Sequence, residues 1–244
     1  MRVRGGRNQY GQPVGILMLD TKFPRIPGDV GNAASYDYPV LFKVVKGALG
    51  KRVVRKKTDS RLLKPFIDAA KELQDDGVRA VTTSCGFLSA FQDRMAEELR
   101  VPVFTSALLL VPMVHRMIGA KKRIGIITAN SKALGREHLK GAGIVGIPLA
   151  IAGMEEEREF RRSFLQNGET LDPEKVKRET LKVAAKLVSD HPDTGAIVME
   201  CTNLVPYSRA VHQATGLPVF DIHTLIDMVF EGVVVPERFG RDYL

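Results

Sequence analysis

The sequence predicts an α/β protein with two pseudo-symmetric lobes, each a mostly parallel sheet flanked by helices, and an active site in the cleft between them. Two observations support this prediction. Apolar runs with strand character alternate with helical stretches, which is the pattern of right-handed β-α-β crossovers. A strand–cysteine–helix–strand unit also occurs twice, at 80–104 and at 196–220, and in both copies a proline follows the cysteine by 17 residues.

Composition indicates an ordinary globular protein. The chain has 244 residues, of which 44% are hydrophobic and 26% charged, so a packed core is expected. Two cysteines make no disulfide framework, and no apolar stretch suits a signal peptide or a membrane span, so we expect a cytoplasmic protein with no membrane partner. The net charge is +8, and the basic cluster Lys51–Lys57 lacks interleaved aromatic residues, which favours a solvated loop.

The first half begins with a basic arm over residues 1–13 and a buried strand at Val14–Leu19, whose apolar run is continuous. A loop rich in proline and glycine follows over 21–39, and its length indicates a functional role. The other expected elements are helices at 62–73, 89–99 and 108–118 and strands at 80–85 and 101–104.

The second half repeats this order, with a strand at Ile124–Thr128 in the place of the first strand. A long helix is expected from Asp172 to Ser189, because an N-cap aspartate, a proline and an acid stand at its start. The charged segment 155–162 is expected to be a solvated helix face. The other expected elements are helices at 132–140, 206–214 and 224–231 and strands at 147–151, 196–201 and 217–220.

These elements are expected to form one lobe over 14–119 plus 217–244 and a second lobe over 120–216. Ligands of parallel sheets bind beyond the carboxyl ends of the strands. Both cysteines, Asp20 and Thr128 lie at such ends, so four strand ends are expected to meet in one cleft.

No motif indicates a metal or an organic cofactor. Gly141–Gly146 matches G-x-G-x-x-G, but a helix precedes it and a strand follows, which is the reverse of the dinucleotide-binding context. The five histidines lack the spacing of metal ligands. We therefore predict a protein without a cofactor.

Cys85 and Cys201 are the candidate catalytic residues. A single buried cysteine is usually a small apolar side chain, but these two hold equivalent places in the repeat, where a strand ends and a helix begins. N–H groups at a helix start can lower a thiol pKa. Two opposed thiols suit the inversion of a stereocentre, since one removes the α-proton and the other returns a proton. The groups expected to stabilise the carbanion are the backbone N–H groups of Gly86, Phe87, Thr202 and Asn203 and the hydroxyl of Thr128.

Three further residues are candidates for the site. Arg25, in the long loop, is either a clamp for the substrate carboxylate or a surface arginine. Glu200 either orients Cys201 or lies at the lobe interface, and its charge would raise a thiol pKa. Asp20 is a candidate acid behind the substrate-binding residues.

Ser84-Cys85 and Glu200-Cys201-Thr202-Asn203, on duplicated α/β halves, resemble the aspartate/glutamate racemase superfamily over roughly residues 14–230. The resemblance implies a cofactor-independent racemase or epimerase of an amino acid or derivative (aspartate, glutamate or hydantoin type), with two-base proton transfer between the cysteines. It implies a small carboxylate or hydantoin substrate, with Ser84 among the residues that bind it. Gly86-Phe87 departs from the family's Asn-Thr, Glu200 from a small residue, and Asn203 from His or Glu.

Two alternatives stay open. An isomerase, lyase or decarboxylase of a small dicarboxylic acid would use one cysteine as nucleophile or proton donor. A non-catalytic module would bind nucleic acid through Lys51–Lys57, but we rank it last and predict no nucleic-acid partner. A homo-oligomer is compatible with the sequence.

Overall fold

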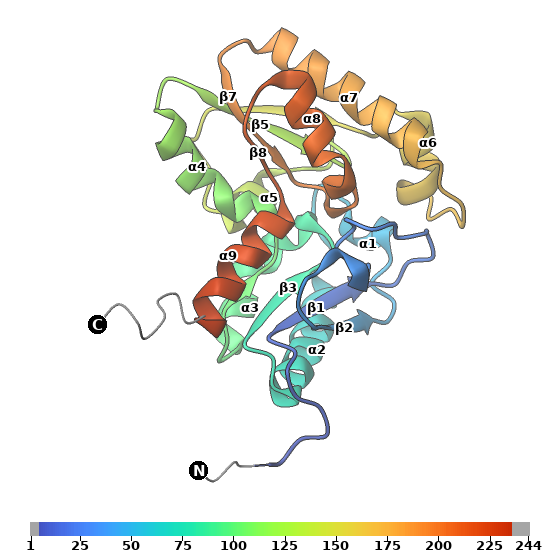
Figure 1. The fold of residues 1–244 in the computed structure, drawn as a ribbon, viewed down its shortest axis with the longest axis vertical. Helices are drawn as coiled ribbons and strands as arrows, with labels where there is room; N and C mark the ends of the chain where they lie inside the picture. The colour runs from blue at the N-terminus through green and yellow to red at the C-terminus, as the bar shows by residue number, and fades with distance from the viewer. Residues whose placement is uncertain (1–4, 236–244) are drawn as a thin grey trace, which may run out of the picture.

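Two parallel β-sheets, one from each half of the chain, form the framework of the protein (Figure 1). The computed structural model describes residues 5–235, so residues 1–4 of the expected arm and 236–244 of the expected first lobe lie outside it. The first sheet has the order β2-β1-β3-β4 and the second β6-β5-β7-β8, so the two halves share one topology and the predicted fold is confirmed. The strands of the first sheet are β1 (Val14–Leu19), β2 (Val40–Val45), β3 (Ala80–Thr83) and β4 (Val103–Phe104). Those of the second sheet are β5 (Arg123–Thr128), β6 (Leu149–Gly153), β7 (Thr194–Met199) and β8 (Val219–Phe220).

Helices connect and cover the strands. The α-helices of residues 5–235 are α1 (Gly50–Val53), α2 (Leu63–Asp76), α3 (Gln92–Glu98), α4 (Val111–Ile118), α5 (Arg136–Gly141), α6 (Arg158–Phe160), α7 (Pro173–Asp190), α8 (Ser208–Thr215) and α9 (Ile222–Val234). Short 3₁₀-helices are η1 (Ala33–Ser35), η2 (Ser60–Leu62), η3 (Gly86–Phe91), η4 (Ala107–Leu110) and η6 (Thr202–Tyr207), and η5 (Arg161–Leu165) is a π-helical turn. In this part of the chain no helix has both the length and the apolar character that a bilayer crossing needs.

The central strands and the start of the long helix α7 form as the local sequence predicts. Every residue of β1 and β7 is buried, as expected for interior strands of parallel sheets. Asp172 caps α7 by accepting a hydrogen bond from the Lys175 N–H, and Pro173 occupies the first turn. These two features define the start of α7 as predicted.

The duplication extends to the packing of helices on strands. A Cβ added to Gly15 in β1 would lie 2.9 Å from Leu73 Cδ1 of α2. A Cβ added to Gly125 in β5 would lie 2.8 Å from Leu187 Cδ2 of α7. Each half therefore uses a glycine in its first strand to bring a helix close to its sheet.

The two halves exchange one helix each. α4 follows the first sheet in sequence but packs against β5 and β7, whereas α9 follows the second sheet and packs against β3 (Figure 1). β8 pairs with β7, so the prediction that assigned residues 217–220 to the first lobe is wrong for this strand. α4 was likewise assigned to the first lobe but packs on the second sheet, whereas α9 packs on β3 of the first sheet. The rest of the division stays a prediction.

One strand was missed. The loop expected over 21–39 ends at β2, an edge strand that pairs in parallel with β1. Its side chains are mostly half-buried, and Lys43 forms an ion pair with Glu72 of α2. A lysine within a short, half-buried edge strand weakens the apolar signal on which the prediction depends.

We expect Gly15→Ala and Gly125→Ala each to lower the free energy of unfolding by about 1–3 kcal/mol, because a methyl group overpacks the strand–helix contact. Urea denaturation followed by circular dichroism measures the change. Gly232→Ala is the matched control, since Gly232 is exposed in α9 and its added Cβ meets no atom within 4 Å. This variant should keep or gain stability, because alanine favours helices. Unchanged stability in the two strand variants would contradict the close packing.

Candidate active site

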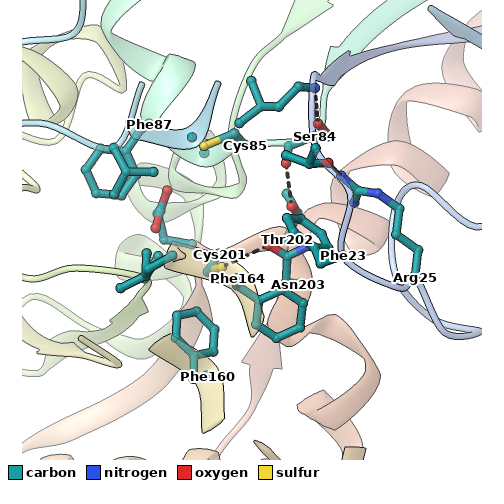
Figure 2. Close-up of a pocket in the computed structure, with 18 residues that line it drawn as sticks. Phe23, Arg25, Ser84, Cys85, Phe87, Phe160, Phe164, Cys201, Thr202 and Asn203 are labelled. Carbon is teal, nitrogen blue, oxygen red and sulfur yellow. Dashed lines mark hydrogen bonds between the residues drawn. The ribbon is translucent and has the colours of Figure 1, made fainter. Parts of the chain in front are cut away.

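The carboxyl ends of the central strands open onto one cavity between the two sheets (Figure 2). β3 leads into Ser84 and Cys85, and β7 leads into Glu200 and Cys201. All the predicted site residues line this cavity except Thr128 and Asp20. Those that line it are Arg25, Ser84, Cys85, Gly86, Phe87, Glu200, Cys201, Thr202 and Asn203.

The two cysteines have equivalent local geometry. Each has an extended backbone and directly precedes a 3₁₀-helix, η3 after Cys85 and η6 after Cys201. The N–H two residues further on, of Phe87 or Asn203, donates to the corresponding thiol. Cys201 is buried and its S–H is directed at Asn203 Oδ1, 3.8 Å away, whereas Cys85 is partly exposed. The duplicated sequence therefore places two thiols in one cavity with different exposure.

The thiols are harder to ionise than the sequence suggested. Burial raises the pKa of Cys85 to about 12 and that of Cys201 well above its ordinary value, and the nearby charge of Glu200 raises both further. The N–H groups of Phe87 and Asn203 act in the opposite direction but are the smaller effect. The expectation of a lowered thiol pKa is thus wrong, because removing a thiolate from water outweighs one hydrogen bond.

Glu200 is a fully buried carboxyl group beside both thiols. Its Oε2 accepts a 2.6 Å hydrogen bond from the Thr128 hydroxyl, whereas Oε1 has no hydrogen-bond partner among the described residues. Burial raises its pKa to about 7, although the Thr128 hydroxyl and the Ala129 N–H favour the charged form. Thr128 therefore acts on this carboxyl group rather than on the cavity wall.

Gly86 makes room for the Glu200 carboxyl group. A Cβ at position 86 would contact Glu200 Oε1 and lie 2.6 Å from the Glu200 carbonyl oxygen, closer than real atoms approach. The two departures from the family pattern, a glycine at 86 and a glutamate at 200, are therefore one packing arrangement. The side chain missing at 86 is replaced by the carboxyl group of 200.

Arg25 lies in the cavity wall and is already paired. Its Nη1 donates to Asp29 Oδ1 at 2.7 Å, its Nη2 to the Thr21 hydroxyl at 3.1 Å, and its guanidinium stacks over the Phe23 ring at 4.6 Å. Asp29 is 2% exposed, and its other oxygen accepts a 2.8 Å hydrogen bond from Asn203 Nδ2. Sequence reasoning missed Asp29, a buried acid four residues after Arg25 that joins the long loop to the second cysteine segment.

A second link joins the cysteine segments to each other. The Thr202 hydroxyl donates to the Ser84 carbonyl at 2.7 Å, and the Ser84 hydroxyl accepts the Leu19 N–H at 2.9 Å. Asp20 has a different task, because its carboxylate accepts the Gly47 N–H at 3.0 Å and so holds the turn after β2. The prediction that Asp20 lies behind the substrate-binding residues finds no support in these contacts.

Three aromatic rings line the cavity that were not expected there (Figure 2). Phe164 packs edge-on against Phe23 at 5.0 Å and against Phe160 at 5.1 Å between ring centroids. The segment 155–162 was expected to be a solvated helix face, yet Phe160 and Glu159 within it are buried. The spacing of four residues between Phe160 and Phe164 was the signal for a shared inward face. Sequence reasoning gave priority to the charges around them.

The described residues offer no group of three or more His, Cys, Asp or Glu side chains that could hold a metal ion. The chemistry available from the cavity wall is therefore that of two thiols, one buried carboxyl group, an arginine and backbone N–H groups.

Comparisons with known proteins identify relatives of this chain. A family model described as Asp/Glu/hydantoin racemase matches residues 38–226. Dimethylsulfoniopropionate lyase of Durusdinium sp. clade D is 35% identical over 233 residues, which are 93% of this chain and 77% of the relative. Dimethylsulfoniopropionate lyase 7 of Emiliania huxleyi (strain CCMP1516) is 32% identical over 236 residues, 93% of this chain and 69% of the relative. Among solved structures, allantoin racemase from Pseudomonas fluorescens superimposes with a TM-score of 0.60 at 17% identity, over 91% of each chain.

These relatives correct one prediction. Both sequence relatives are named lyases, so the prediction that this chain is an isomerase of the amino-acid racemase type is wrong. The alternative that includes a lyase or decarboxylase agrees better with them. The resemblance read from the two cysteine segments is confirmed: the chain belongs to the Asp/Glu/hydantoin racemase family.

Proposed function

We propose that this protein is a lyase that removes a proton next to the carboxylate of a small acid and expels a leaving group from the adjacent carbon, with dimethylsulfoniopropionate as its substrate. The observation that carries the proposal is the match of 93% of this chain to a dimethylsulfoniopropionate lyase at 35% identity. The cavity supports it, because its wall combines two thiols, whose thiolate form can act as a base, with an arginine and several apolar side chains.

The reaction needs one base. A thiolate takes the α-proton, the electrons of the C–H bond form the carbon–carbon double bond, and the bond from the β-carbon to sulfur breaks. The electron pair leaves with the sulfur, so the products are dimethyl sulfide and acrylate. Atoms and charges balance without an oxidant or reductant. A racemase needs an acid on the opposite face as well, whereas an elimination does not.

We propose Cys85 as the base. It is partly exposed, and the charge of Arg25 favours its thiolate. Cys201 is buried deeper, and its S–H is directed at Asn203 Oδ1, an arrangement that favours the neutral thiol. Arg25, on the cavity wall, is the candidate to hold the substrate carboxylate.

The first expected outcome is activity itself. Purified protein incubated with dimethylsulfoniopropionate should release dimethyl sulfide, measured in the headspace by gas chromatography, and an equal amount of acrylate, measured by proton NMR. The double variant Cys85→Ser/Cys201→Ser is the control and should be inactive. Absence of dimethyl sulfide would refute the proposed substrate, and 3-hydroxypropionate in place of acrylate would show substitution by water rather than elimination.

The two cysteines should differ in their effect on turnover. We expect Cys85→Ser to lower kcat by about 10²–10⁴-fold, the usual contribution of a general base. Cys201→Ser should keep kcat within about tenfold, because an elimination needs no second proton donor. Steady-state release of dimethyl sulfide measures both. The opposite order would assign the base to Cys201, and equal losses would contradict a single-base mechanism.

The thiol pKa should depend on Glu200. Since Cys85 and Cys201 are the only cysteines, the rate of iodoacetamide labelling in a Cys201→Ser background reports the Cys85 thiolate alone. The raised pKa predicts a rate that keeps rising between pH 7 and pH 10. Adding Glu200→Gln removes a negative charge and lowers this pKa, so labelling at pH 8 should be roughly three- to tenfold faster.

The effect of Glu200→Gln on the labelling rate should become smaller towards pH 7, because Glu200 itself takes up a proton there. Glu169→Gln, which neutralises an exposed carboxylate, should leave the labelling rate unchanged. Identical rates with and without the Glu200 charge would contradict the coupling.

A further inference from the structure

We infer that the Glu200 carboxyl group is the specificity-determining group for a positively charged ligand: the cavity binds an onium cation, a sulfonium or quaternary ammonium group, between Glu200 and the aromatic rings of Phe160 and Phe164. The inference rests on the proposed function and extends it, since it assigns the residue that would recognise the cationic end of the substrate.

The first argument is that Glu200 lacks a cationic partner. The hydrogen bonds to its carboxyl group come from neutral donors, the Thr128 hydroxyl and the Ala129 N–H, and no ion pair to it exists among residues 5–235. Arg25 is the cationic side chain of the cavity wall, and Asp29 already neutralises it at 2.7 Å. A buried carboxyl group without a counter-charge is costly unless it holds a proton or meets a cation supplied from outside.

The second argument concerns the two oxygens of the Glu200 carboxyl group. Thr128 binds Oε2, which leaves Oε1 without a hydrogen-bond partner. Position 86, which would cover Oε1 if it carried a side chain, is a glycine. Glu200 and Gly86 both line the cavity. Oε1 is therefore an unsatisfied oxygen with almost no exposed surface of its own, beside a cavity in which a cation would meet the charge of the carboxylate.

The third argument is the aromatic wall. Phe160 and Phe164 pack on each other with ring centroids 5.1 Å apart, and both line the same cavity (Figure 2). Aromatic faces attract onium groups, which cannot donate strong hydrogen bonds but carry a diffuse positive charge. The stacking of the Arg25 guanidinium over Phe23 shows the same attraction within the protein.

The location also suits the chemistry. The charge of Glu200 acts on both thiols, so a cation held by Glu200 lies beside them. Such a cation would offset the charge that disfavours the thiolate of Cys85. With the onium group at Glu200 and the carboxylate towards Arg25, the α-carbon of a short zwitterion would lie between the two ends, in a cavity whose wall includes both thiols.

A matched pair of ligands isolates the effect of the ligand's positive charge on binding affinity. 3-(Trimethylammonio)propionate and 4,4-dimethylpentanoate have the same shape and the same carboxylate. They differ only in the central atom of the terminal group, which is a positively charged nitrogen in the first and a neutral carbon in the second. Isothermal titration calorimetry at pH 8 measures both dissociation constants. We expect the wild-type protein to bind the cation about 10–100-fold more tightly than the neutral isostere.

Glu200→Gln preserves the size of the side chain and removes its charge, and should reduce this preference to about threefold or less. Glu169→Gln, on the exposed surface, should keep the full preference. Equal affinities in the wild-type protein, no binding of the cation, or a preference that survives in Glu200→Gln would each overturn the inference. If the Glu200 variant does not fold, the comparison of the two ligands with the wild-type protein still tests whether the cavity prefers a cation.

The result is separate from the test of lyase activity. Release of dimethyl sulfide without any preference for the cation would leave the proposed function standing and remove Glu200 as the recognition group. A cation preference that depends on Glu200, without release of dimethyl sulfide, would establish the onium site and refute the proposed reaction.

Discussion

The hydrogen bond from the Thr202 hydroxyl to the Ser84 carbonyl is the contact on which the arrangement of the cavity depends. It is buried, 2.7 Å long, and joins the residues beside the two cysteines across 118 positions of sequence. Ser84 is in turn bonded through its hydroxyl to the end of β1. A second bond, from Asn203 to Asp29, ties the next residue of η6 to the long loop of the first half. Both polar side chains that follow Cys201 are thus used to hold the opposite half in place.

The cavity formed in this way is a poor environment for negative charge before a ligand arrives. Two thiols and a carboxyl group are buried together, and their pKa values are raised for that reason. The arginine in the wall is occupied by Asp29. A zwitterionic ligand would change this balance at both ends. Burial, which works against the free thiolate, also strengthens every attraction to a ligand charge once water is excluded.

The fold could be predicted because its signal is duplicated. Each half repeats the order of strands, the cysteine and the glycine that lets a helix approach, so two imperfect copies reinforced one interpretation. β2 was not predicted, because a half-buried edge strand tolerates lysine and so lacks a continuous apolar run. β8 was placed in the wrong lobe, because sequence order does not reveal which sheet a short strand joins.

The site could be predicted in its composition but not in its electrostatics. The residues around the cysteines were found from their position at strand ends, whereas Phe160 and Phe164 were hidden in a charged segment. The sign of the thiol pKa shift depends on how deeply a group is buried, and local sequence does not encode that depth. Asp29 likewise gains its importance only from Asn203, 174 residues away.

The contact between Gly86 and Glu200 restricts how this protein can have diverged from other members of its family. A side chain at 86 and a glutamate at 200 compete for one volume, so the two positions cannot change independently. A side chain at 86 would also approach the carbonyl oxygen of 200 to 2.6 Å, so restoring one would require the backbone to shift as well as a smaller residue at 200.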